Sequence, residues 1–135
     1  MSPTQRARAF CKAQGWTSQI VERFNIYAKV RQDLFGCLDL VVLDGQGGGP
    51  LGVQVCAGAS HAARRTKMLA EPRLLEWLRS PARAEIWSYS RRGAARKRKL
   101  WTLRRETLTV ESFEPQVNPL PAAAQLLRGD RDPAA

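Results

Sequence analysis

Two neighbouring apolar runs carry the residues whose types could do chemistry. Asp39 lies in the run 38–43, and Gln54 and Cys56 lie in the run 51–57. A carboxylate inside an apolar run is costly to bury unless a divalent metal or a basic group lies against it. If the two runs form adjacent strands, the acid and the amide come side by side, and a segment rich in Arg and Lys follows at once. This layout suggests a site for phosphate chemistry.

The periodicity of apolar residues indicates which elements would position these side chains. The pattern favours an α/β fold in which helices cover a mixed central sheet, in the order αβββαβ with one extra strand. The run 38–43 is almost continuously apolar, so we expect a central strand that is covered on both faces. The predicted elements are a helix at 4–14, strands at 24–30, 38–43 and 51–57, a helix at 61–70 that Ser60 caps, and strands at 84–90 and 100–103, which 108–110 could extend. Pro72 either kinks the helix 61–70 or begins a second helical segment at its first turn.

Length and charge narrow the classes of protein. The 135 residues support one domain, which we place at 1–112, and a Pro- and Ala-rich segment, 113–135, which we expect to be a flexible tail. Lys and Arg total 22 against 12 Asp and Glu, a net charge of +10. Such an excess favours nucleic acid or another polyanion as partner, although Arg-rich composition also follows from a GC-rich genome. The basic residues cluster at 64–67, 91–99 and 104–105.

Cysteine usage and the amino terminus bear on the compartment. The three cysteines are an odd number and form no CxxC pair, so neither a zinc site nor a disulfide framework is indicated. The first residues lack the apolar core of a signal peptide, and no run has the length of a membrane span. We therefore expect a cytoplasmic protein that does not contact membranes.

These residues, in this order, resemble the PD-(D/E)XK nuclease superfamily, in particular its small Holliday-junction-resolvase-like and phage or Mrr-like members. That superfamily has an αβββαβ restriction-endonuclease-like core, with a carboxylate on the second core strand and an (E/D/Q)-x-K triplet on the third. Asp39 matches the carboxylate, and Gln54 matches the first position of the triplet. Cys56 stands where the family has lysine, and Glu22 matches an extra acid near the first helix. The resemblance covers residues 4–110.

The resemblance implies a metal-dependent DNA endonuclease that hydrolyses phosphodiester bonds, with branched or junction DNA among its substrates. Glu22, Asp39 and Gln54 would bind Mg²⁺ or Mn²⁺, whose preferred ligands are oxygens. Because some superfamily members carry the motif lysine on the following helix, Lys67 is the expected replacement, and the catalytic set becomes Asp39, Gln54 and Lys67. Dimers are common in the superfamily, so a homodimer is compatible with the resemblance.

Several side chains are expected to contact the phosphates of DNA. They come from the predicted strand, from the helix that follows the triplet and from the basic turn, and they are Arg31, Ser60, Arg64, Arg65, Arg96, Lys97, Arg98 and Lys99. The amino terminus of the helix after Ser60 also favours an anion. His61 is a further proton carrier near the mouth of the proposed site.

Each assignment has a structural alternative. Asp39 could pair with an arginine such as Arg31, Gln54 could be a hydrogen-bonded core amide, and Cys56 could be a small buried apolar residue. His61 could lie at the surface, and the basic residues at 64–67 could form a solvated helix face. Two other functions stay open: a nuclease-fold DNA-binding protein whose altered triplet has lost catalysis, and an interaction protein of a phage or mobile element.

Overall fold

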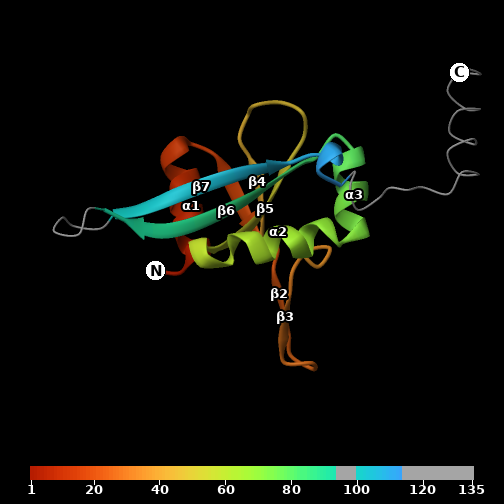
Figure 1. The fold of residues 1–135 in the computed structure, drawn as a ribbon, viewed down its shortest axis with the longest axis horizontal. Coiled ribbons are helices and arrows are strands. Elements are labelled where there is room, and N and C mark those ends of the chain that lie inside the picture. The colour runs from red at the N-terminus through yellow and green to blue at the C-terminus, as the bar shows by residue number, and fades with distance from the viewer. Residues whose placement is uncertain (94–99, 114–135) are drawn as a thin grey trace, which may run out of the picture.

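A five-stranded sheet forms the centre of the computed structural model, which describes residues 1–93 and 100–113. The strand order is β1-β4-β5-β6-β7, and only β5 and β6 run parallel, so the sheet is mixed (Figure 1). The sheet and its flanking helices confirm the predicted α/β class. The strands are β1 (Thr17–Ile20), β4 (Leu40–Leu43), β5 (Leu51–Ala57), β6 (Arg83–Arg92) and β7 (Leu100–Leu108).

Helix α1 (Pro3–Gln14) covers one face of this sheet. Its amino terminus is a capping box, in which Ser2 and Gln5 exchange hydrogen bonds between side chain and backbone, and it ends at Gly15, whose φ of 79° suits glycine. The helix packs on β1, β5 and β6. Between the helix and the sheet lies one half of the core, to which Ala7 and Trp87 contribute.

Helices α2 (His61–Leu69) and α3 (Pro72–Arg79) cover the opposite face. A short 3₁₀ turn, η1 (Gly58–Ser60), leads from β5 into α2, and a second, η2 (Val110–Phe113), follows β7. Pro72 begins α3 at its first turn, where a missing N–H costs nothing. Alternate residues of β5 and β6 point to the two faces, so both halves of the core form on the same strands.

One prediction about the strands before Asp39 is wrong, and one strand was missed. The alternating segment 24–30 is a hairpin rather than one half-buried strand: β2 (Arg23–Asn25) turns into β3 (Val30–Gln32). Its apolar side chains are exposed, so the alternation does not mark a core face. The first strand of the central sheet is instead β1, which the sequence analysis missed because the segment 17–20 has only one large apolar residue.

The carboxyl end of the predicted domain also differs. Phe113, which the sequence analysis assigned to the tail, is buried in the core beneath α3. Strand β7 is continuous from Leu100 to Leu108. The basic residues Arg96, Lys97, Arg98 and Lys99 and the segment 114–135 lie outside the described residues.

Candidate metal and phosphate site

Asp39 and Gln54 lie side by side, as the sequence predicts. In the antiparallel register of β4 and β5, Leu40 faces Val53. Asp39 precedes Leu40 and Gln54 follows Val53, so this register brings Asp39 and Gln54 side by side. The Gln54 Nε2 group donates a hydrogen bond of 2.6 Å to Asp39 Oδ2. The N–H of Val55 donates to the same oxygen at 2.9 Å. The carboxylate is thus held at the junction of the two strands.

Two further acids approach this carboxylate. One carboxylate oxygen from each of Glu22, Asp33 and Asp39 lies within 4.8 Å of the others. Glu22 is positioned by its neighbour Val21, whose N–H donates to the backbone oxygen of Asp39 at 2.9 Å. Asp33 directly follows β3, at the point where the hairpin chain returns to the sheet. We therefore name Glu22, Asp33 and Asp39 the acidic cluster.

Asp33 was missed by the sequence analysis. It lies outside every apolar run and belongs to no motif position, and only the return path of the hairpin brings it to Asp39. A signal existed in the sequence, since Asp33 precedes the turn residue Gly36, whose φ of 74° marks a sharp change of direction. That signal indicates a turn but gives no indication of what the turn approaches.

Asp39, the buried member of the acidic cluster, has no basic partner within residues 1–93 and 100–113. Asp39 is 5 % exposed, and burial, followed by the negative charges of Asp33 and Glu22, raises its pKa to about 7, although the Val55 N–H acts in the opposite direction. Arg31 pairs with Glu22 instead, at 3.6 Å, from an exposed position. Among the described residues, the hydrogen-bond partners of Asp39 are an amide and a backbone N–H rather than an arginine.

A second, independent feature points to a missing ligand. Gln54 is 1 % exposed, and its Oε1 atom has no hydrogen-bond partner among the described residues. A buried carbonyl oxygen without a partner costs about 1–3 kcal/mol. Gln54 lines the same cavity as all three acids. The three carboxylates make an oxygen-only donor set, which fits Mg²⁺ or Mn²⁺. Gln54 presents its Nε2 group to Asp39, so its Oε1 atom would join this set only if the amide turned over.

The cavity that holds these donors has a volume of about 330 Å³ and also receives groups that favour an anion. The first residues of α1, Pro3 and Thr4, line it, and so does Ser60 at the start of α2. The amino-terminal residues of both helices therefore line the cavity, and a helix amino terminus favours an anion. Ser60 makes no side-chain capping bond, contrary to the prediction that it caps α2.

Arg64 is the cation that lines this cavity, beside Cys56. Its charge favours the thiolate of Cys56, but burial outweighs that effect and raises the pKa of the thiol. Cys56 is therefore a buried apolar residue in character. Lys67, the expected replacement for the motif lysine, lines a neighbouring hollow of about 420 Å³ together with Arg31 and Arg73. Asp33 lines both hollows, so the two adjoin at the acidic cluster.

His61 and Arg65 lie away from the cavity. The ring of His61 is 3 % exposed and bridges Ser88 Oγ and Glu106 Oε1, each at 2.7 Å. Arg65 Nε donates to the other oxygen of Glu106 at 2.8 Å. These bonds join α2 to β6 and β7. His61 is therefore neither a surface residue nor a group at the mouth of the site, and Arg65 is engaged within the fold.

Comparison with known proteins finds no relative of this chain. No protein-family model matches the chain, and neither a curated protein nor a solved structure matches it significantly. Within residues 1–93 and 100–113, no helix has both the length and the apolar character needed to cross a membrane.

Proposed function

We propose that this protein is a metal-dependent DNA endonuclease of PD-(D/E)XK type, with the acidic cluster and Gln54 as its metal site. The observation that carries the proposal is a cluster of three carboxylates whose buried member, Asp39, has no basic partner among the described residues, and beside it a buried amide oxygen that has no hydrogen-bond partner there. All four residues line one cavity. A buried acid that only stabilised the fold would pair with a base, as Asp44 pairs with Arg83 in two hydrogen bonds of 2.7 and 3.0 Å, whereas Asp39 has no such partner in the described part of the chain.

The arrangement of the elements supports the same proposal. If the hairpin β2–β3 and helix α3 are treated as insertions, the helices and strands follow the order αβββαβ, namely α1, β1, β4, β5, α2 and β6, with β7 as the extra strand. Asp39 then precedes the second core strand, and Gln54 lies on the third. Gln54 thus lies on the strand to which the resemblance assigns the triplet, and Asp39 lies one residue before the strand to which it assigns the carboxylate.

The chain's own residues would divide the work of phosphodiester hydrolysis. A divalent ion held by the acidic cluster would act as a Lewis acid and lower the pKa of a bound water. Asp33, Asp39 and Gln54 would fix its position, while Arg64 and the amino termini of α1 and α2 would neutralise the charge of the phosphate oxygens. Arg64 thus takes over the electrostatic part that Cys56 cannot supply.

A second function is favoured by one observation. Cys56 occupies the position of the motif lysine, so the chain could be a DNA-binding protein on a nuclease fold that has lost catalysis. Both functions predict metal uptake at the acidic cluster and DNA binding, but only the first predicts strand cleavage.

Supercoiled plasmid DNA gives the direct test. We expect the wild-type protein to nick or linearise it with Mn²⁺ or Mg²⁺ at pH 8, and to leave it intact in excess EDTA. Binding is measured in parallel with Ca²⁺, which takes oxygen ligands without the geometry that Mg²⁺ demands. DNA binding with no cleavage at any divalent ion would reject the nuclease and support the second function.

A further inference from the structure

The hairpin of β2 and β3 stands apart from the central sheet. The two strands pair only with each other among the described elements, and the ribbon projects away from the body of the fold (Figure 1). Its turn is ordered by Asn25, whose Oδ1 accepts hydrogen bonds of 3.0 Å from the N–H groups of Tyr27 and Ala28. Lys29 completes the turn with a positive φ of 55°. The arm is therefore preformed, which reduces the entropy lost when it binds.

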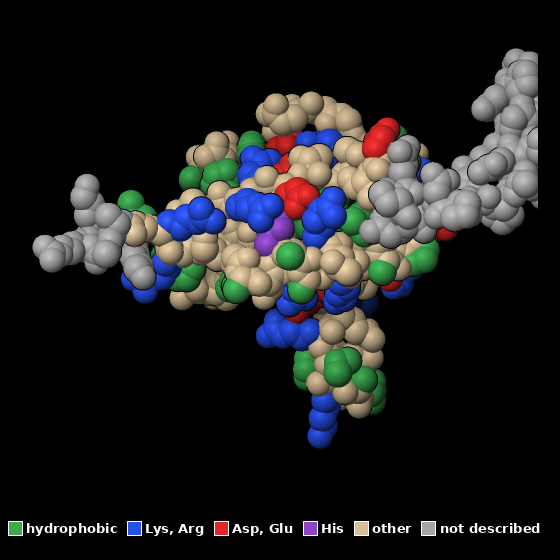
Figure 2. Space-filling model, viewed as in Figure 1, with side chains coloured by type: hydrophobic (Ala, Val, Ile, Leu, Met, Phe, Trp, Pro, Cys, Tyr) green, Lys and Arg blue, Asp and Glu red, His purple; other side chains and the backbone are tan. Residues whose placement is uncertain are grey.

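Large apolar side chains cover this arm and face solvent. Figure 2 shows them gathered along the projecting hairpin. Tyr27 is 93 % exposed and Phe24 is 59 % exposed, and Ile26 and Val30 are also exposed. Scattered exposed apolar residues need no explanation, but four on one short arm form a surface that is typical of a binding site.

The charge of the arm limits what could cover this surface. Residues 23–32 contain three cations, Arg23, Lys29 and Arg31, and no acid. A second copy of the chain that packed symmetrically on this arm would bring like charges together. A polyanion with flat apolar faces would pair with these cations and stack on the aromatic rings. Unpaired DNA has this chemistry, since its phosphates are negative and its bases are flat and apolar on their faces.

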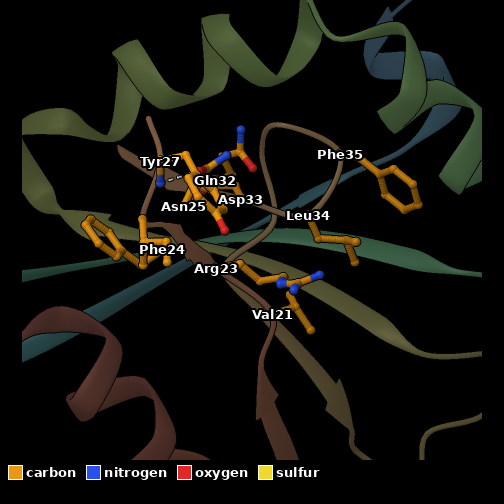
Figure 3. A pocket seen from close by; sticks show the side chains of 10 residues that line it. Val21, Arg23, Phe24, Asn25, Tyr27, Gln32, Asp33, Leu34 and Phe35 are labelled. Carbon is orange, nitrogen blue, oxygen red and sulfur yellow. Dashed lines mark hydrogen bonds between the residues drawn. The ribbon is translucent and has the colours of Figure 1, made fainter. Parts of the chain in front are cut away.

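A groove along the hairpin, lined by residues from its turn to its base, leads toward the acidic cluster. It has a volume of about 560 Å³, and its walls come from both hairpin strands and the turn after β3 (Figure 3). Three aromatic rings line it, those of Phe24, Tyr27 and Phe35, and Asp33 lines it too. Because Asp33 also lines the cavity of the acidic cluster, the groove and that cavity adjoin at one residue.

From this geometry we propose that the hairpin groove binds unpaired bases of DNA next to the scissile phosphate. The bases stack on Phe24 and Tyr27, while the hairpin cations contact the backbone. Bases within an intact duplex are already stacked and cannot enter, so the groove selects strands with a flap, a gap or a branch. This inference rests on the proposed function for its substrate, and it adds that the substrate must be locally single-stranded.

The test compares binding to two probes at equal salt, in EDTA so that no cleavage occurs. The probes are a fluorescently labelled single-stranded dT₁₅ and a labelled 15-base-pair duplex. Replacing both Phe24 and Tyr27 by alanine should weaken dT₁₅ binding about 10-fold or more, because each stacked base contributes roughly 1–3 kcal/mol. Duplex affinity should change less than about 3-fold, since the backbone cations remain.

Two control variants sharpen the comparison. Leu43→Ala removes a side chain that is 58 % exposed on β4, outside the hairpin, and should leave both affinities unchanged. Tyr27→Phe keeps the ring and should retain dT₁₅ binding. All the changed side chains are exposed, and circular dichroism checks that each variant folds.

Several outcomes overturn the inference. The inference is wrong if the double alanine variant loses affinity equally for both probes, or loses no affinity for dT₁₅. It is also wrong if the wild-type protein sediments as a dimer that the double alanine substitution dissociates. Hairpin-dependent binding to anionic vesicles in place of dT₁₅ would overturn it as well. Ring-dependent dT₁₅ binding without cleavage in Mn²⁺ would reject the nuclease but keep the hairpin assignment. Cleavage in Mn²⁺ together with dT₁₅ binding that does not depend on the two rings would keep the nuclease proposal and reject the hairpin assignment.

Discussion

Replacing Asp39 by asparagine should abolish DNA cleavage and, at the same time, make the metal-free protein more stable at pH 8. The two effects have one cause, the buried carboxylate next to Asp33 and Glu22. Cleavage should fall at least 10³-fold, because the metal site loses the acid at its centre. The opposite sign of the stability change matters, since it excludes unfolding as the reason for lost activity.

The pH dependence of this stability change follows from the raised pKa of Asp39. In the unfolded chain the group titrates near 3.8, and in the folded protein near 7. Between these values the unfolded state releases its proton while the folded state keeps it, so the carboxyl group lowers stability progressively as pH rises, and the loss is complete above about 7. This difference in the pKa of Asp39 between the unfolded and folded states lowers the free energy of unfolding at pH 8 by at most about 4 kcal/mol.

Urea unfolding at pH 4 and pH 8, without metal and with excess Mn²⁺, measures both effects. We expect wild type and Asp39→Asn to differ little at pH 4, and the variant to be more stable at pH 8. Mn²⁺ at about 100 times its dissociation constant should stabilise wild type by about 2.7 kcal/mol and the variant hardly at all. Glu111→Gln, which changes an exposed acid of η2, serves as the control. A variant that is less stable at pH 8 and still responds to Mn²⁺ would refute the assignment.

The second large effect concerns Arg64. Its replacement by glutamine should lower the cleavage rate about 10²–10³-fold, the range seen when one group that stabilises transition-state charge is removed. The guanidinium lines the cavity with the acidic cluster, and among the described lining residues it is the sole Lys or Arg. Stabilisation by Mn²⁺ should persist, because Arg64 contributes no ligand oxygen.

Lys67→Gln is the matched control, since the side chain lies one turn further along α2 and lines the neighbouring hollow. Its cleavage rate should fall less than 10-fold, through weaker DNA binding alone. If Lys67→Gln removes cleavage and Arg64→Gln does not, the lysine that the resemblance nominates would be the catalytic cation, and the assignment from the cavity would be wrong.

The sequence predicted the part of the site that depends on local pattern. Strand β5 was predicted at its observed bounds, and α2 begins after Ser60 as predicted, although the Ser60 side chain does not cap it. Pro72, which was expected either to kink a helix or to begin one, begins α3. The pairing of Asp39 with Gln54 followed because a glycine-rich turn joins two apolar runs, and such a turn favours antiparallel neighbours. These features involve residues close in sequence, where periodicity and turn chemistry carry information.

The rest depends on the path of the chain in space. The apolar alternation at 24–30 is the same for a half-buried strand and for an exposed arm that binds a partner, so periodicity could not separate them. Asp33 joins the cluster only because that arm returns to the sheet. Which of Arg64 and Lys67 lines the cavity of the acidic cluster likewise depends on how α2 is rotated about its axis over the sheet. The sequence does not determine this rotation.

The most direct test of the central claim is anomalous scattering from crystals grown with Mn²⁺, collected at the manganese absorption edge. We expect an anomalous peak from Mn²⁺ between Glu22, Asp33 and Asp39, within about 2.0–2.6 Å of their carboxylate oxygens. No such peak should appear in crystals of Asp39→Asn. A cluster without a peak at saturating Mn²⁺, or a Lys or Arg side chain seated among the three acids, would contradict the account.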